Sequence, residues 1–276
     1  MSPTSVSQWN DPAYLASRQY KTDRNLAARQ LIHRRFSSAR VNWPAWLYAL
    51  AGVQPGQSVL DVGCGNGRIW ADNLSPRHPA RLSVTLLDLS GGMLRAAATA
   101  VSGRVVRWQG VQASAMQLPV ASARFNVAFA NHMLYHVPQP ARAIAEFRRV
   151  LLPGGTLVAA LNGETHMQEL WQLVLALIGG NAGFRSRHFL PGHAAPLLEQ
   201  HFKRVTRHHF ENDLRVTDAG LLWQYVLSMN PAAAANIPPK TAQSLEAEFK
   251  RRVNHDINAN GHFHITTSAM AFVCRK

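Results

Sequence analysis

Short apolar runs alternate with amphipathic stretches along residues 51–161. Apolar runs bounded by turn residues are typical of strands buried on both faces of a parallel sheet. Strands that alternate with helices in this way predict an α/β fold, a doubly wound (Rossmann-like), mostly parallel sheet with helices on both faces. We expect strands near 58–62, 83–88, 104–109, 125–130 and 156–161, and helices near 67–74, 91–101 and 140–151.

The alternation stops on both sides of this segment. Before it, Leu26 to His33 and Trp43 to Leu50 have apolar residues at helical spacing, which predicts two amphipathic helices. After it, two further apolar runs at 205–210 and 263–274 predict strands. The remaining apolar patterns predict helices near 167–178, 194–201, 217–226 and 245–253, and Thr217 is placed to cap the third of these.

A glycine-rich loop follows the first strand of the alternating segment. It has the pattern Asp61-x-Gly63-x-Gly65-x-Gly67, with glycine at every second position. Glycine lets the backbone turn sharply and approach a ligand closely, and the next helix directs its N-terminal amides at the same place. The sequence therefore predicts a nucleotide-type site at this end of the sheet.

The spacing of the glycines limits the kinds of nucleotide that the loop can bind. A dinucleotide fingerprint would require a third glycine where Arg68 stands, and no Gly-Lys-Ser/Thr phosphate loop follows. The second strand ends in Asp88, an acid placed to accept hydrogen bonds from ribose hydroxyls. The loop therefore suits an adenosine ligand that need not carry phosphates.

With these motifs, residues 58–161 resemble the class I S-adenosylmethionine-dependent methyltransferases, the broad group that includes the ubiquinone/menaquinone C-methyltransferases. The resemblance implies S-adenosyl-L-methionine as cofactor and a seven-stranded sheet whose final strand is antiparallel. It also implies an N-terminal helical lid at 1–50, a cofactor-binding core at 51–161, a substrate cap at 162–255 with the sixth strand, and the last core strand at 256–276. The blocks that carry it are 59–67, 87–94, 118–127, 131–137 and 147–155.

The resemblance also assigns roles to single residues. Gly63 and Gly65 would meet the methionine moiety, Asp61 would support the loop, and Asp88 would hold the ribose. Ser114 stands where the family usually has an acid beside the adenine, and Asn126 replaces another usual acid, which leaves a non-catalytic binder as an alternative. The other cofactor-binding candidates are Leu89 and Ala115 at the adenine, Asn131 at the end of the fourth strand, and Tyr20, Asn25 and Arg29 at the methionine end.

Histidines after the fourth and fifth strands are the candidates for acid–base catalysis. Strand ends of doubly wound folds face the ligand crevice, and a histidine titrates near neutrality. We rank His136 first and His132 second, with His166 third, and expect the rate to fall below about pH 6 if free imidazole acts. The alternative is that each histidine is a packed, hydrogen-bonded residue. No cluster has metal-ligand spacing, so no metal is expected.

Composition sets the remaining expectations. The chain has two cysteines, Cys64 and Cys274, which gives no disulfide framework, and the polar N-terminus is unlike a signal peptide, so a cytoplasmic protein without a membrane segment is expected. The net charge of +14 raises an RNA methyltransferase as an alternative, although no separate nucleic-acid module is evident. The preferred function is methyl transfer to an O, N or C atom of a small organic acceptor, such as one of secondary metabolism, by a monomer or homodimer.

Overall fold

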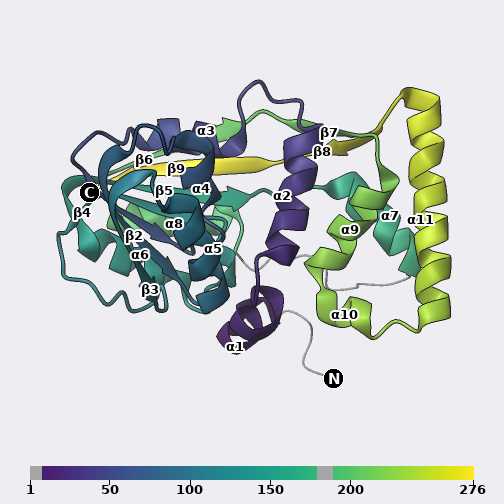
Figure 1. The fold of residues 1–276 in the computed structure, drawn as a ribbon, viewed down its shortest axis with the longest axis horizontal. Coiled ribbons are helices and arrows are strands. Elements are labelled where there is room, and N and C mark those ends of the chain that lie inside the picture. The colour runs from purple at the N-terminus through teal and green to yellow at the C-terminus, as the bar shows by residue number, and fades with distance from the viewer. Residues whose placement is uncertain (1–7, 179–188) are drawn as a thin grey trace.

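A computed structural model of the chain describes residues 8–178 and 189–276. Its larger lobe is built on a seven-stranded sheet with the order β3-β2-β1-β4-β5-β9-β6 (Figure 1). The predicted α/β architecture is thus confirmed, including the final strand, which runs antiparallel to both of its neighbours. The strands of this sheet are β1 (Ser58–Val62), β2 (Ala80–Asp88), β3 (Val105–Gln112), β4 (Phe125–Asn131), β5 (Leu151–Asn162), β6 (Arg204–Phe210) and β9 (Ala269–Arg275).

Successive side chains of a strand point to opposite faces of the sheet, so alternate residues are buried under the helices of one face or of the other. Leu60 and Val62 of β1 pack with α6 (Pro140–Val150) and α8 (Pro191–His201). Val59, the residue before Leu60, points to the other face and packs with α3 (Trp43–Ala51), α4 (Arg68–Asn73) and α5 (Gly91–Val101). The predicted apolar face of 140–151 is therefore buried against one side of the sheet.

A second lobe has its own core, to the right of the sheet in Figure 1. It contains α7 (Gln168–Ile178), α9 (Ala219–Met229), α10 (Pro231–Ala235), α11 (Pro239–Asn260) and a two-stranded sheet of β7 (Asp213–Val216) and β8 (Phe263–Thr266). Helix α2 (Arg24–Phe36) lies between the lobes and adds Ile32 to this second core. We call this lobe the cap.

The N-terminal segment reaches α2 through three short helical turns. They are η1 (Gln8–Asn10), α1 (Pro12–Tyr14) and the π-helical turn η2 (Leu15–Gln19). One further 3-10 turn, η3 (Leu134–His136), follows β4. These turns matter because they place aromatic and histidine side chains beside the carboxyl ends of the strands.

Several expectations about the elements and their places need correction. The run 263–274 is not one strand, because residues 266–268 turn away to pair with the loop after β5: Thr266 and Ser268 accept from the backbone of Met167 and Gly163. Helix α3, expected in the lid, packs on the sheet, and so does α8, expected in the cap. Strand β7 was not predicted, and Asp218 rather than Thr217 caps α9.

None of the helices in the two described ranges has the length and hydrophobicity that crossing a lipid bilayer requires.

The cap core yields a stability prediction with a matched control on one helix. Leu222 of α9 is fully buried, whereas Leu227 of the same helix is 36% exposed. Leu222→Ala should lower the free energy of unfolding by about 2–5 kcal/mol, because it removes contacts and leaves a cavity. Leu227→Ala should cost well under that, and urea denaturation measures both. Equal losses would contradict the burial of α9.

Candidate functional site

A cavity of about 880 Å³ lies where the sheet lobe, α2 and the cap meet. Its floor is formed by the residues that follow β1, β2, β4 and β5, and its roof by the N-terminal turns, α2 and Tyr225 of α9. Because the sheet order reverses between β1 and β4, this is the topological switch point, where open α/β sheets bind ligands.

The glycine loop adopts a backbone that side chains would obstruct. Gly63, Gly65 and Gly67 all have positive φ, between +54° and +71°. A Cβ on Gly63 would lie 2.7 Å from the Cβ of Met133, and one on Gly65 would lie 2.9 Å from Leu26 of α2. The missing side chains therefore let the loop pack directly against the end of β4 and against the lid helix.

Asp88 fixes this loop to the end of β2. Its Oδ2 accepts from the backbone N–H of Gly65 at 3.0 Å, and its Oδ1 accepts from that of Ser90 at 2.9 Å. Burial raises the pKa of Asp88, while these backbone hydrogen bonds oppose the rise. Each carboxylate oxygen has a second lone pair, so Asp88 can also accept bonds from ligand hydroxyls.

Asp61 is a buried acid at the floor of the cavity. It is 2% exposed, and its Oδ2 accepts from the indole N–H of Trp70 at 2.8 Å. Burial raises the pKa of Asp61 to about 7, and the charge of Asp88 adds to the rise against the Trp70 bond. A buried carboxylate of this kind suits a ligand that brings a cationic group to it.

His136 is held between two groups of the N-terminal segment. Its Nδ1 donates to the Trp9 carbonyl at 3.0 Å, because a carbonyl can only accept. Its Nε2 must then accept from the Tyr20 hydroxyl, 2.9 Å away. The Trp9 ring stacks on the imidazole at 5.8 Å between centroids. We call this group, Trp9, Tyr20 and His136, the His136 clamp.

The electrostatics of the clamp correct the expected pH dependence. Burial lowers the pKa of His136 to about 4, with the charge of Arg29 adding to the fall and the Trp9 bond opposing it. His136 is therefore neutral well below pH 6, and an acid limb at about pH 6 cannot arise from it. The Trp9 partner was not foreseen, because nothing in the sequence links a tryptophan at position 9 to this histidine.

Further hydrogen bonds tie the lid to both lobes. Ser90, which caps α5, donates through Oγ to the Tyr20 carbonyl at 2.6 Å. Arg29 donates to the Ser228 carbonyl of α9 at 3.3 Å and lies 5.4 Å from the centre of the Tyr20 ring. Asn25 donates to the Gln19 carbonyl at 3.1 Å, so this candidate braces the lid and is not among the residues lining the cavity.

The remaining candidates mostly line the cavity as well. The Asn131 side chain accepts from the Trp43 indole at 3.2 Å, and His132 stacks near Trp43 at 4.9 Å between centroids. Ser114 lines the cavity, but Asn126 does not. Asn126 lies near the start of β4, and its side chain accepts from the Ser58 amide. The asparagine in place of the family's usual acid therefore affects the contact between β4 and β1 and not the cavity. Apart from Asn25, the residues proposed for cofactor or catalysis line the cavity: Tyr20, Arg29, Asp61, Gly63, Gly65, Asp88, Leu89, Ser114, Ala115, Asn131, His132, His136 and His166.

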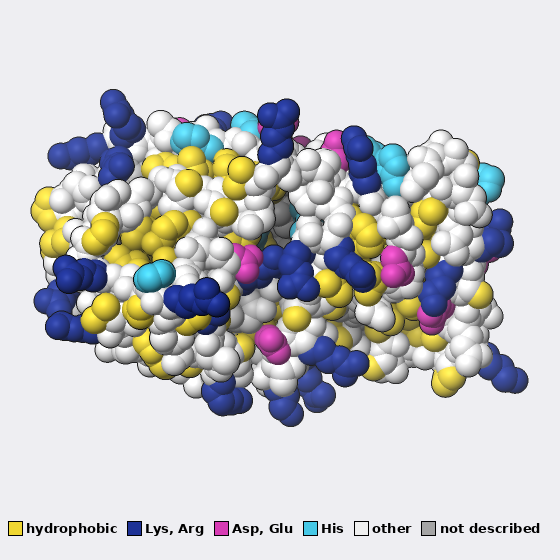
Figure 2. All heavy atoms as spheres, turned by 45° about the horizontal axis from the view of Figure 1, so that its top comes forward, with side chains coloured by type: hydrophobic (Ala, Val, Ile, Leu, Met, Phe, Trp, Pro, Cys, Tyr) yellow, Lys and Arg dark blue, Asp and Glu magenta, His cyan; other side chains and the backbone are white. Residues whose placement is uncertain are grey.

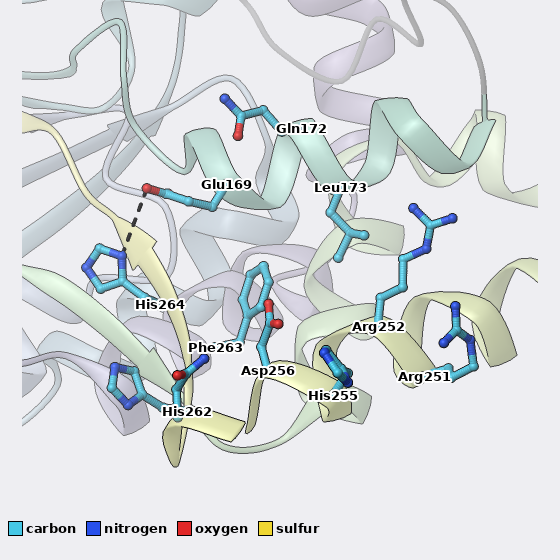
Figure 3. A pocket seen from close by; sticks show the side chains of 11 residues that line it. Glu169, Gln172, Leu173, Arg251, Arg252, His255, Asp256, His262, Phe263 and His264 are labelled. Atoms are coloured by element: carbon cyan, nitrogen blue, oxygen red, sulfur yellow. Dashed lines mark ion pairs between the residues drawn. The ribbon is translucent and has the colours of Figure 1, made fainter. Parts of the chain in front are cut away.

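A second hollow of about 690 Å³ lies between α7, α11 and β8 (Figure 3). Three of its charged side chains have structural partners: Arg251 and Arg252 donate to Glu248, and Glu169 accepts from Thr266 of β8. Burial opposes ionisation of Glu169, but the Thr266 bonds prevail and its pKa is lowered. These interactions connect elements of the cap, so we assign the second hollow a structural role. Within the described residues, His, Cys, Asp and Glu side chains form no group of three or more that could hold a metal ion.

Comparison with known proteins agrees with this geometry. Residues 60–159 match the family model described as a methyltransferase domain. An uncharacterized methyltransferase of Mycobacterium tuberculosis is 32% identical over 137 residues, which cover 49% of this chain and 66% of that protein. A demethylmenaquinone methyltransferase of Renibacterium salmoninarum is 35% identical over 118 residues, or 43% of this chain and 46% of that protein. The sequence matches thus span only part of these relatives.

The fold extends the similarity beyond the matched segment. A phosphoethanolamine N-methyltransferase of Haemonchus contortus, solved in complex with S-adenosylhomocysteine, has a TM-score of 0.57 and 17% identity. The comparison covers 97% of this chain and 60% of that chain. At this identity the likeness shows the fold, including the arrangement of strands around the crevice.

Asp61 gives a pH prediction whose sign follows from its raised pKa. The unfolded acid ionises near pH 4 and the folded one near pH 7, so Asp61 favours folding below pH 4 and this contribution is lost as the pH rises to about 7. Asp61→Asn should therefore gain stability relative to the wild type between pH 5 and pH 8, by on the order of 2 kcal/mol. Urea unfolding at both pH values measures the difference. The same pH dependence in both proteins would show that Asp61 is already ionised at pH 5.

Proposed function

We propose that this chain, whose residues 60–159 match a methyltransferase domain, is a class I S-adenosylmethionine-dependent methyltransferase. It would transfer a methyl group from S-adenosyl-L-methionine to an O, N or C atom of a small organic acceptor. The observation that supports the proposal most is the cavity that joins the glycine loop and Asp88 to the space under the cap. One cavity with two chemically different halves suits a reaction between two bound molecules.

The residues of one half fit the cofactor. Burial raises the pKa of Asp61, but the methionine ammonium group would favour its ionised form, so Asp61 is proposed as the counter-charge of that group. Arg29 is proposed to supply a positive charge for the methionine carboxylate. Asp88 is proposed for the ribose hydroxyls, since it has acceptor capacity beyond the Gly65 and Ser90 bonds. Leu89, Ser114 and Ala115 are proposed for the adenine, where the Ser114 hydroxyl can accept from an amino group without bringing a charge.

The protein has to position the reactants more than activate them. When bound, the cofactor supplies a methyl group already activated on a sulfonium, which a nucleophile displaces in line. The lid and the cap are proposed to cover the reactants and to hold the acceptor against the strand ends. Alignment of this kind can supply effective molarities of about 10⁵ M or more.

The His136 clamp can remove a proton where the acceptor is a hydroxyl. In the proposed step the acceptor O–H gives its proton to the Tyr20 oxygen, while the Tyr20 proton passes to Nε2 of His136. The 2.9 Å hydrogen bond between Tyr20 and His136 is the path for the second transfer. The Trp9 carbonyl fixes the tautomer that leaves Nε2 able to accept. His136 thus acts through Tyr20, and an acceptor without a transferable proton would need only alignment.

The size of the cavity favours a small acceptor over RNA. A volume of about 880 Å³ is near the upper end of the roughly 300–1,000 Å³ usual for ligand pockets, which leaves room for a second small molecule beside the cofactor. Lys and Arg side chains are dispersed over the face drawn in Figure 2 instead of forming one continuous band. A phosphate backbone would require such a band.

Cofactor binding is tested at Asp88. Asp88→Ala should weaken binding of S-adenosylhomocysteine about tenfold or more, because hydrogen bonds to a charged group contribute about 1.5–3 kcal/mol. Titration calorimetry measures the affinity, and Asp256→Ala, which changes an acid of the second hollow, is the matched control. Unchanged affinity in Asp88→Ala, or tighter binding of a nicotinamide dinucleotide by the wild type, would refute the cofactor assignment.

The clamp is tested at a single hydroxyl. Tyr20→Phe and His136→Ala should each lower turnover of a hydroxyl acceptor at least about tenfold and leave cofactor affinity nearly unchanged, since a positioned base typically contributes 10²–10⁴-fold. Tyr14→Phe removes a hydroxyl from the same N-terminal segment, outside the cavity lining, and should have full turnover. If Tyr20→Phe also has full turnover, catalysis depends on alignment alone.

A further inference from the structure

Three histidines line the part of the cavity that lies beyond β1, next to the ends of β4 and β5. His33 comes from α2, His132 directly follows β4, and His166 follows β5. The rings of His33 and His166 are stacked, with 5.8 Å between centroids and an interplanar angle of 12°. We call these three residues the histidine wall. The cofactor half lies over β1 and β2, so the wall lies over the strands left for the acceptor.

The backbone is strained at His132 of the wall and next to His166, and hydrogen bonds hold it in that conformation. His132 has φ of +53° and Met167, the neighbour of His166, has φ of +60°, a region that residues other than glycine rarely adopt. Each is fixed by a backbone hydrogen bond, from His132 to the Ala160 carbonyl and from Met167 to the Thr266 carbonyl. The Ser268 amide donates to Nδ1 of His166 at 3.3 Å. Strain that the surroundings hold in this way concentrates at ligand sites.

The wall has polar atoms and no negative charge. Nδ1 of His132 is buried and has no hydrogen-bond partner among the described residues. The carboxylates that line the cavity are Asp61, Asp72 and Asp88, which belong to the cofactor half or, for Asp72, pair with Arg68. A cationic acceptor would therefore find no counter-charge at the wall.

The wall is also short of positive charge. Burial, and then the charge of Arg68, lowers the pKa of His33 to about 4, and burial followed by the nearby His33 and His136 lowers that of His132 to about 3. Both imidazoles are neutral at pH 7. Four arginines line the cavity: Arg29, Arg34, Arg40 and Arg68. Arg34 and Arg40 are exposed, Arg68 pairs with Asp72, and Arg29 is proposed for the cofactor carboxylate. An anionic acceptor would therefore find its counter-charge near the rim and not at the wall.

Aromatic rings complete the surroundings of the wall. Trp43 lies against His132, and Tyr225 meets the edge of His33 at 6.3 Å between centroids. Trp171 lies beside Tyr225 at 6.4 Å. Flat rings on several sides favour a planar guest, and neutral imidazoles can both donate to and accept from its oxygen atoms.

We propose that His33, His132 and His166 recognise the acceptor, and that this acceptor is an uncharged, planar aromatic molecule carrying hydroxyl or carbonyl oxygens. The inference rests on the proposed methyltransferase function and specifies the substrate class of the same cavity. The histidines position the acceptor through hydrogen bonds, while its reacting oxygen lies toward Tyr20.

The test compares three single-ring probes on the wild-type protein saturated with S-adenosylhomocysteine. Catechol is uncharged at pH 7, benzylamine is a cation and benzoate is an anion. Titration followed by the ring C–H signals of the histidines in NMR should show catechol binding, with shifts at His33, His132 and His166. Benzylamine and benzoate should bind at least about tenfold more weakly. Equal or tighter binding of either charged probe, or no binding of catechol, would overturn the proposal.

Variants separate the wall from the cofactor site. His33→Asn and His166→Asn should each weaken catechol at least about fivefold without changing the affinity for S-adenosylhomocysteine. His255 is an exposed residue of α11, so His255→Asn is the matched control and should bind catechol as the wild type does. Unchanged catechol binding in both wall variants would contradict the proposed role of the wall but leave the proposed methyltransferase function intact. Failure of the wild type to bind S-adenosylhomocysteine would instead overturn the methyltransferase function and, with it, this inference.

Discussion

The close packing of the glycine loop is the constraint on which the rest of the site depends. Gly63 lies against Met133 after β4, Gly65 against Leu26 of the lid helix, and Gly67 against Ala97 of α5. Each contact is closer than a side chain would permit, so one short loop joins the sheet, the lid and a flanking helix. Asp88 then fixes the loop by accepting from Gly65. Cofactor site and lid are therefore parts of one packed unit.

The lid extends from that unit over the cavity. Its N-terminal turns bring the Trp9 carbonyl and the Tyr20 hydroxyl to the two nitrogens of His136, while Arg29 connects it to the cap at Ser228. Because both nitrogens are engaged, His136 is a residue of fixed tautomer with a lowered pKa, unlike an exposed imidazole. The same interactions form the proposed path for a proton, and the histidine wall lines the cavity beyond it.

Sequence patterns predicted the parts that depend on local chemistry. The strand–loop–helix unit at 58–74 and the acid at Asp88 follow from glycine conformation and apolar periodicity, and both lie where the pattern placed them. Long-range partners could not be predicted: neither the Trp9 bond to His136 nor the stacking of His33 on His166 leaves a local signal. The break between β8 and β9 was missed for the same reason, since residues 266–268 are held by the distant loop after β5.

The most direct test of the proposed site is a crystal structure of the protein with S-adenosylhomocysteine. We expect the homocysteine between Gly63, Gly65 and Arg29, the ribose on Asp88, and an open space beside the sulfur that is bounded by Tyr20 and the histidine wall. A ligand bound outside this cavity, or one whose sulfur points away from Tyr20 and His132, would contradict it.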